Sequence, residues 1–120
     1  MKKEDLIPPL DGVQVFAEPL EGDSQWMVYV KNLRNEALDL VLISSTSYDD
    51  TGDVQTITLR HQIGELLPGE IKPIERLDPA LFHLKNEYWF SGWSGTVLLD
   101  YAFFFAPNQL SNASSAIYAQ

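Results

Sequence analysis

The sequence predicts an all-β protein built as an antiparallel β-sandwich with one short helical turn. Three observations favour this fold class. Between Trp26 and Arg76, runs rich in Val, Ile, Leu, Tyr and Thr are separated by short segments of turn-forming residues. Within several of these runs apolar and polar residues alternate, as in a strand that buries one face. Only residues 78–84 carry a helical signal, so no helical layer is expected.

The expected strands follow one another at short intervals. Seven are predicted, at 13–17, 25–32, 37–48, 54–63, 70–77, 87–93 and 96–106. The polar turn at 32–36 is expected to join the second and third strands as a hairpin. A tight turn at Ser94 and Gly95 is expected to join the last two. Because Pro73 cannot donate to a β-ladder, its strand is expected to be an edge strand or an interrupted strand.

The single helical signal has a clear start. Asp78 is a typical capping residue, and Pro79 fits the first helical position because its missing N–H has no partner there in any case. Residues 78–84 therefore predict one or two helical turns between the fifth and sixth strands.

The chain is expected to form one domain, since 120 residues is close to the commonest domain size. Residues 1–12 predict an extended N-terminal lead-in, interrupted by two prolines. Residues 13–106 predict the single β-sandwich domain. Residues 107–120 are small, polar and uncapped, and predict a flexible C-terminal tail.

The strand count and several short motifs resemble a known class of domain. Seven strands in about 95 residues match an immunoglobulin-like sandwich, although the Cys–Trp–Cys hallmark of antibody domains is missing. The LLPGE corner at 66–70 resembles corners of bacterial immunoglobulin-like modules. The runs TLRH (58–61) and NEYW (86–89) are similar to small uncharacterised bacterial single-domain proteins. The resemblance implies an immunoglobulin-like fold and brings no catalytic or binding residues with it.

Composition narrows the class of function. Seventeen acidic and eight basic residues, a net charge of −9, disfavour nucleic-acid binding, which depends on neutralising phosphates with Lys and Arg. Anionic membranes are disfavoured for the same reason. The excess of acidic residues is expected to keep the protein soluble. The alternative is that it serves to bind a basic partner. No signal-peptide pattern and no apolar run of membrane-spanning length occurs, so a cytoplasmic protein is expected.

The sequence contains no recognised catalytic or metal-binding pattern. It has no cysteine, no phosphate loop, no dinucleotide fingerprint and no nucleophile elbow. His61 and His83 are expected to be structural or solvated, and His61 to be neutral and hydrogen-bonded. The DDTGD segment at 49–53 lacks the spacing of an EF-hand and predicts a β-turn. A non-enzymatic protein without cofactor or metal is therefore expected.

The last two strands carry the sharpest functional signal because both of their faces are apolar. One face of this pair carries Trp89, Trp93, Leu98 and Phe104, while the other supplies further aromatics for the core. A sandwich strand ordinarily buries one face only. The second face is therefore expected to be covered by something.

Three kinds of cover are consistent with that face. The helical turn or a terminal segment could fold over it, or a protein partner could bind it. A sugar chain could stack on Trp89 and Trp93, which strand geometry separates by roughly 13 Å. The prediction is a protein-interaction module that forms a homo-oligomer, most simply a homodimer, or binds another protein through Trp89, Trp93, Leu98 and Phe104. The alternative is a carbohydrate-binding module.

Overall fold

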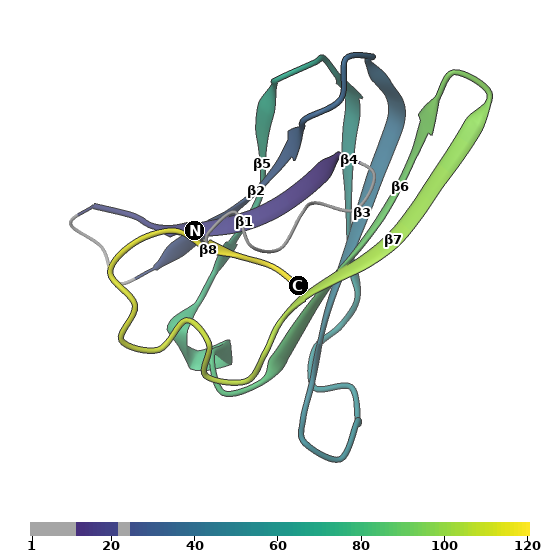
Figure 1. The fold of residues 1–120 in the computed structure, drawn as a ribbon. Coiled ribbons are helices and arrows are strands. Elements are labelled where there is room, and N and C mark those ends of the chain that lie inside the picture. The colour runs from purple at the N-terminus through teal and green to yellow at the C-terminus, as the bar shows by residue number, and fades with distance from the viewer. Residues whose placement is uncertain (1–11, 22–24) are drawn as a thin grey trace.

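The computed structural model describes residues 12–21 and 25–120 as two packed, four-stranded antiparallel sheets (Figure 1). The strands are β1 (Val13–Pro19), β2 (Trp26–Asn32), β3 (Leu38–Tyr48), β4 (Leu59–Leu66), β5 (Ile71–Leu77), β6 (Lys85–Ser94), β7 (Val97–Phe105) and β8 (Ile117–Tyr118). The predicted all-β sandwich is confirmed. The expected lead-in lies, apart from Gly12, outside the described residues.

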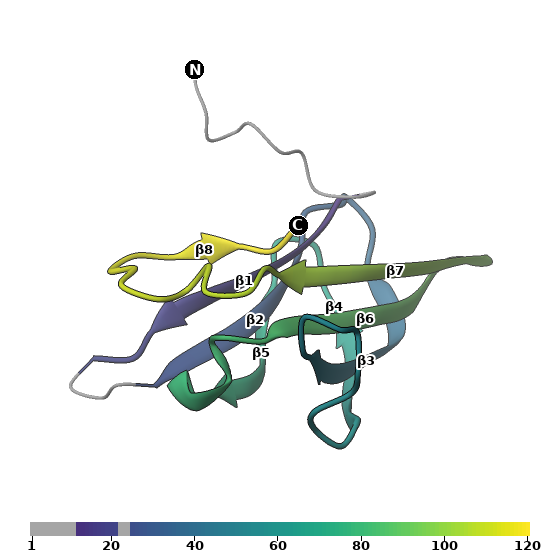
Figure 2. The ribbon, with the colours of Figure 1, turned by 90° about the horizontal axis from the view of Figure 1, so that it is seen from below.

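The order of the strands resembles that of immunoglobulin domains in part. One sheet has the order β5-β2-β1-β8 and the other the order β4-β3-β6-β7. The first, second and fifth strands thus share a sheet, and the third, sixth and seventh share the other, as in immunoglobulin domains. β4 joins the second sheet beside β3, and β8 adds an eighth strand next to β1 (Figure 2).

The core lies between the two sheets and is built from alternate residues of each strand. Val28 and Val30 of β2 face Ile43 of β3 and Phe90 of β6 across the core, and all four are fully buried. This follows from the two-residue period of a strand, which sends every second side chain to the same face. The opposite face of each strand is left for other contacts.

The turn at 32–36 crosses between the sheets and is not a hairpin, contrary to expectation. β2 pairs with β1 and β5, whereas β3 pairs with β4 and β6. Asn32 is fully buried and holds the turn: its Nδ2 donates to the Glu36 carbonyl at 2.8 Å and to the Leu66 carbonyl at 2.9 Å. A five-residue connection suits either path, and burying two apolar stripes against each other favours the crossing.

Several local predictions are confirmed. β5, which contains Pro73, pairs only with β2 and is an edge strand. Residues Pro79–Leu81 form a single 3₁₀ turn, and the Asp78 carboxylate accepts a hydrogen bond from the Ala80 N–H at 2.9 Å. β6 and β7 form the expected hairpin around Gly95. Among the described residues, no helix has the length and apolar character needed to span a membrane.

The fourth strand begins later than the sequence predicts. It spans Leu59–Leu66 rather than 54–63, and Val54 makes only an isolated bridge with Tyr48. The Thr56 hydroxyl accepts a hydrogen bond from the backbone N–H of Ser47 at 3.0 Å. A side chain therefore replaces a ladder bond here, which threonine can do because its oxygen competes with backbone carbonyls.

The segment 107–120, for which a flexible tail is expected, is packed against the sandwich. Leu110 is buried, β8 pairs with β1, and Gln120 exchanges two backbone hydrogen bonds with Phe104 of β7, at 2.9 and 3.0 Å. The segment thus joins an edge of each sheet (Figures 1 and 2). Its polar composition hides this role because backbone pairing does not depend on apolar side chains.

Candidate functional site

The four residues predicted as a site share the outer face of β6 and β7. Trp89 is 48% exposed, Trp93 38% and Leu98 46%, while Phe104 is partly buried. Trp93 lies opposite Leu98 in the strand register, so their side chains are neighbours on that face. The structure therefore brings three of the four together as exposed apolar groups. We call Trp89, Trp93 and Leu98 the aromatic face.

Polar partners orient the aromatic rings on this outer face. The Trp89 indole N–H donates a hydrogen bond to the Asp100 carboxylate on the neighbouring strand. The Lys85 ammonium lies 4.6 Å from the centre of the Phe104 ring, within the range of a cation–π interaction. Restrained side chains lose less conformational entropy when they bind. The face is thus prepared for a contact, and no part of the chain that the structure describes covers it.

Neither of the two described segments expected to cover the aromatic face does so. The 3₁₀ turn leads into Phe82, which packs edge-on against Trp26, with ring centroids 6.0 Å apart. Residues 107–120 lie along β1 and the end of β7 instead. The described part of the chain therefore leaves Trp89 and Trp93 open to solvent.

Leu40 of β3 is strained and lies at the same end of the sheet as Trp93. Leu40 is 75% exposed and has a φ of 54°, and it follows Asp39, the residue opposite Trp93. The pairing of β3 with β6 is irregular between Asp39 and Leu42, which marks a β-bulge. A left-handed backbone is unfavourable for a bulky side chain, and such strain is found most often at functional surfaces.

Replacing Leu40 by asparagine is expected to raise the free energy of unfolding by about 0.5–1 kcal/mol. Asparagine tolerates a positive φ, and little buried apolar surface is lost because the leucine is exposed. Urea denaturation measures the change. Leu67→Asn is the matched control, since Leu67 is also exposed but has no positive φ. An equal effect in both variants would show that Leu40 is not strained.

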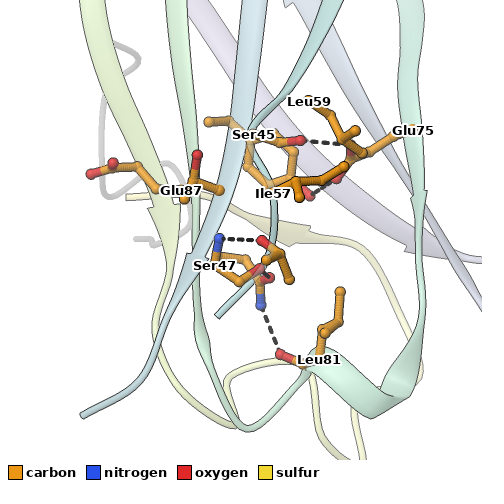
Figure 3. A pocket seen from close by; sticks show the side chains of 11 residues that line it. Ser45, Ser47, Ile57, Leu59, Glu75, Leu81 and Glu87 are labelled. Carbon is orange, nitrogen blue, oxygen red and sulfur yellow. Dashed lines mark hydrogen bonds between the residues drawn. The ribbon is translucent and has the colours of Figure 1, made fainter. Parts of the chain in front are cut away.

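A second candidate site lies inside the sandwich, where the inward face of β3 changes from apolar to polar. Val41 and Ile43 fill the core, but the next two inward positions are Ser45 and Ser47, both buried. Serine is too small to fill the space between the sheets. A hollow of about 140 Å³ remains there, lined also by Glu75 from β5 (Figure 3). We call it the Glu75 hollow.

Glu75 is the acceptor that links the two sheets at this hollow. Its carboxylate accepts from the Ser45 hydroxyl at 2.8 Å, from His61 Nε2 at 2.8 Å and from the Tyr88 hydroxyl at 2.9 Å. The Glu75 side chain is only 15% exposed, and its three donors come from three strands of the opposite sheet. Burial, and then the Glu75 charge, raise the pKa of the Tyr88 hydroxyl well above its ordinary value.

The lower wall of the hollow is a second closed network. The Ser47 hydroxyl donates to Asn86 Oδ1 at 2.5 Å. Asn86 Nδ2 donates to the Leu81 carbonyl at 3.0 Å and to the Leu84 carbonyl at 3.2 Å. These bonds connect β3 and β6 to the 3₁₀ turn. The Ser47 hydroxyl and the Asn86 amide thus donate all of their side-chain hydrogens to protein acceptors.

The structure places the other candidate residues apart from both sites. His83 is exposed just after the 3₁₀ turn. The Asp49 carboxylate accepts four hydrogen bonds within its own loop, from the backbone and hydroxyl of Thr51, the backbone of Asp53 and the amide of Gln55. The Thr51 side-chain bond is the main cause that lowers the pKa of Asp49. In residues 12–21 and 25–120, no three His, Asp or Glu side chains lie close enough together to hold a metal ion.

Glu75 and Tyr88 are not predicted as site residues by the sequence pattern. The expected hydrogen bond of His61 is confirmed, but its partner, Glu75, could not be predicted. A signal was present: Ser45 and Ser47 occupy inward positions of a strand that otherwise alternates as a core strand. Small polar residues at such positions indicate either a buried network or an unfilled space, and here they produce both.

Comparisons of this chain with protein-family models, with curated proteins and with solved structures found no match. The fold and the two candidate sites are therefore the basis for a functional proposal. The aromatic face is an open surface, whereas the Glu75 hollow is a small internal space. The two call for ligands of different size.

Proposed function

We propose that this chain is a cytoplasmic, non-enzymatic protein-interaction module that self-associates through the aromatic face. The observation that carries the proposal is the exposure of Trp89, Trp93 and Leu98, between 38% and 48% each, on one side of one sheet. Apolar patches of this kind are typical of interaction surfaces. Tryptophan is also the residue most enriched among those that dominate binding energy.

The charges around the aromatic face favour a second copy as the partner. The strand register places Arg60 and Lys85 on this side of the sheet, together with four acidic residues, Asp39, Glu65, Glu87 and Asp100. Because both signs of charge are present, two copies can form ion pairs across this face.

The arrangement of these charges is also self-complementary. Arg60 is on β4 and Asp100 on β7, and these strands are the two edges of the sheet. A two-fold axis parallel to the strands places β4 of one copy over β7 of the other. Each Arg60 then approaches the partner's Asp100, and the contact forms twice, as a symmetric dimer requires.

The apolar area sets the expected strength of the dimer. Large aromatic side chains bury roughly 150–250 Å² each, and a standard interface buries about 800 Å² per partner. Because Trp89 and Trp93 are already about half buried, together they supply roughly a quarter of that area. A reversible dimer with a micromolar dissociation constant is therefore expected.

Replacing Trp93 by alanine is expected to weaken self-association at least about tenfold, because tryptophans are among the residues that most often dominate binding energy. Sedimentation equilibrium over a micromolar concentration range measures the dissociation constant. Trp89→Ala is expected to act similarly. Tyr118→Ala, which removes an exposed aromatic ring from the other sheet, is the control and should leave it unchanged.

Two outcomes would overturn the proposal. One is a wild-type chain that stays monomeric throughout the concentration range. The other is a monomer whose tryptophan fluorescence is quenched by oligosaccharides, since exposed Trp89 and Trp93 would respond while the buried Trp26 would not. The second result would favour a carbohydrate-binding module, in which the two rings stack on sugars roughly 13 Å apart.

A further inference from the structure

The Glu75 hollow is not needed for a contact through the aromatic face, and its chemistry points to a ligand of its own. It opens beside Ile57, which precedes β4, and Leu59, the first residue of β4, and these are 77% and 45% exposed (Figure 3). Leu81 of the 3₁₀ turn lies on the inner wall. One side of the hollow is thus apolar, and the facing side carries Ser45, Ser47 and Glu75.

The buried polar groups on the wall have acceptor capacity but no free donor hydrogen. The hydroxyl hydrogens of Ser45 and Tyr88 are used on Glu75, and that of Ser47 is used on Asn86. Both amide hydrogens of Asn86 are used on backbone carbonyls. Each serine oxygen keeps acceptor lone pairs, and so does the carboxylate. A ligand that fits these groups must therefore donate.

The charge of the hollow is also one-sided. The Glu75 carboxylate lies on its wall, and among the described residues no lysine or arginine lines it. Glu87 also lines it, but its carboxylate accepts from the Tyr48 hydroxyl on the outer side of the sheet. A carboxylate near a low-dielectric wall interacts strongly with a cation and unfavourably with an anion. Charge and donor requirement together select a protonated amine, which carries three donor hydrogens and one positive charge.

The volume limits the size of the ligand. A hollow of about 140 Å³ is close to the roughly 150 Å³ of an engineered cavity that holds benzene, so about four to six non-hydrogen atoms fit. We propose that the Glu75 hollow binds a small primary alkylammonium compound. Its ammonium group pairs with Glu75 and the serine oxygens, and its alkyl group contacts Ile57, Leu59 and Leu81.

The test uses three probes with the same branched four-carbon skeleton, isobutylamine, isobutanol and isobutyrate, and follows their binding by NMR of the full chain at pH 7. Isobutylamine is expected to shift the amide signals of Ser47 and Tyr88 in a saturable manner, with a millimolar dissociation constant. Isobutanol should bind at least about tenfold more weakly, because one charge-assisted contact contributes more than a factor of ten. Isobutyrate should not bind.

Variants separate this site from the aromatic face. Glu75→Gln should abolish amine binding. If that variant does not fold, Ile57→Ala, at an exposed position on the apolar side, should still weaken it several-fold, while the exposed Glu65→Gln leaves it unchanged. Trp93→Ala should not affect amine binding, whatever it does to self-association. Equal binding of all three probes, or amine shifts that survive Ile57→Ala and Glu75→Gln alike, would overturn the proposal.

Discussion

Replacing Glu75 by alanine is expected to lower the free energy of unfolding by about 3 kcal/mol. The substitution removes the only acceptor seen for the hydroxyl of Tyr88, which is 1% exposed, and deprives Ser45 and His61 of the same partner. A buried donor without an acceptor loses about 1–3 kcal/mol, although water entering the hollow offsets part of the loss. Urea denaturation at pH 7 measures it.

A double-mutant cycle assigns this loss to the network rather than to charge alone. Tyr88→Phe is expected to destabilise by about 1 kcal/mol, since Glu75 keeps two other donors. Adding Tyr88→Phe to Glu75→Ala should cost almost nothing further, which corresponds to a coupling of about 1 kcal/mol. Glu65→Ala, at an exposed position, is the control. Additive effects, or a Glu75→Ala loss no larger than the control, would contradict the central role of Glu75.

Deleting residues 107–120 is expected to destabilise the domain by about 4 kcal/mol. The deletion exposes the core around Leu110, which is 2% exposed, and removes the hydrogen bonds that join Ala119 to Val15 and Gln120 to Phe104. The loss is close to the whole stability of a weakly stable domain, so partial unfolding at room temperature is expected.

A point substitution tests the same role without removing backbone. Leu110→Ala should lower the free energy of unfolding by about 2–3 kcal/mol, while Ser114→Ala, at an exposed position, should change it by less than about 0.5 kcal/mol. Hydrogen exchange gives a second measurement: the Phe104 and Ala119 amides should be protected in the intact chain. Fast exchange at both, with a stable Leu110→Ala variant, would support the flexible tail that the sequence suggested.

Much of the fold could be predicted because its signals are local. The two-residue alternation of β2 and β6 identified their core faces, the missing N–H of Pro73 put β5 at an edge, and Asp78 marked the 3₁₀ turn. The aromatic face was found in the same way, from the unusual apolar character of the second face. None of these inferences needs knowledge of which strands are neighbours.

Other features could not be predicted from the sequence because they depend on contacts between residues far apart in the chain. The turn at 32–36 has the same residues whether it closes a hairpin or crosses between sheets, and the Asn32 bond to Leu66 that accompanies the crossing spans 34 positions. The hydrogen bonds between Gln120 and Phe104 at the edge of the sheet use backbone atoms alone, so no side chain in the sequence indicates them. Such choices are made by burial and pairing across the whole domain.

By itself, the sequence determined that the chain forms a β-sandwich, which side of β2 and of β6 is buried, and that Trp89, Trp93 and Leu98 share one face. These follow from side-chain periodicity, which acts within a single strand. Only the tertiary structure decided that nothing in the described chain covers that face, that residues 107–120 join the two sheets, and that Glu75 collects donors from three strands. The physical reason is that exposure, edge pairing and networks of hydrogen bonds arise between segments far apart in the chain.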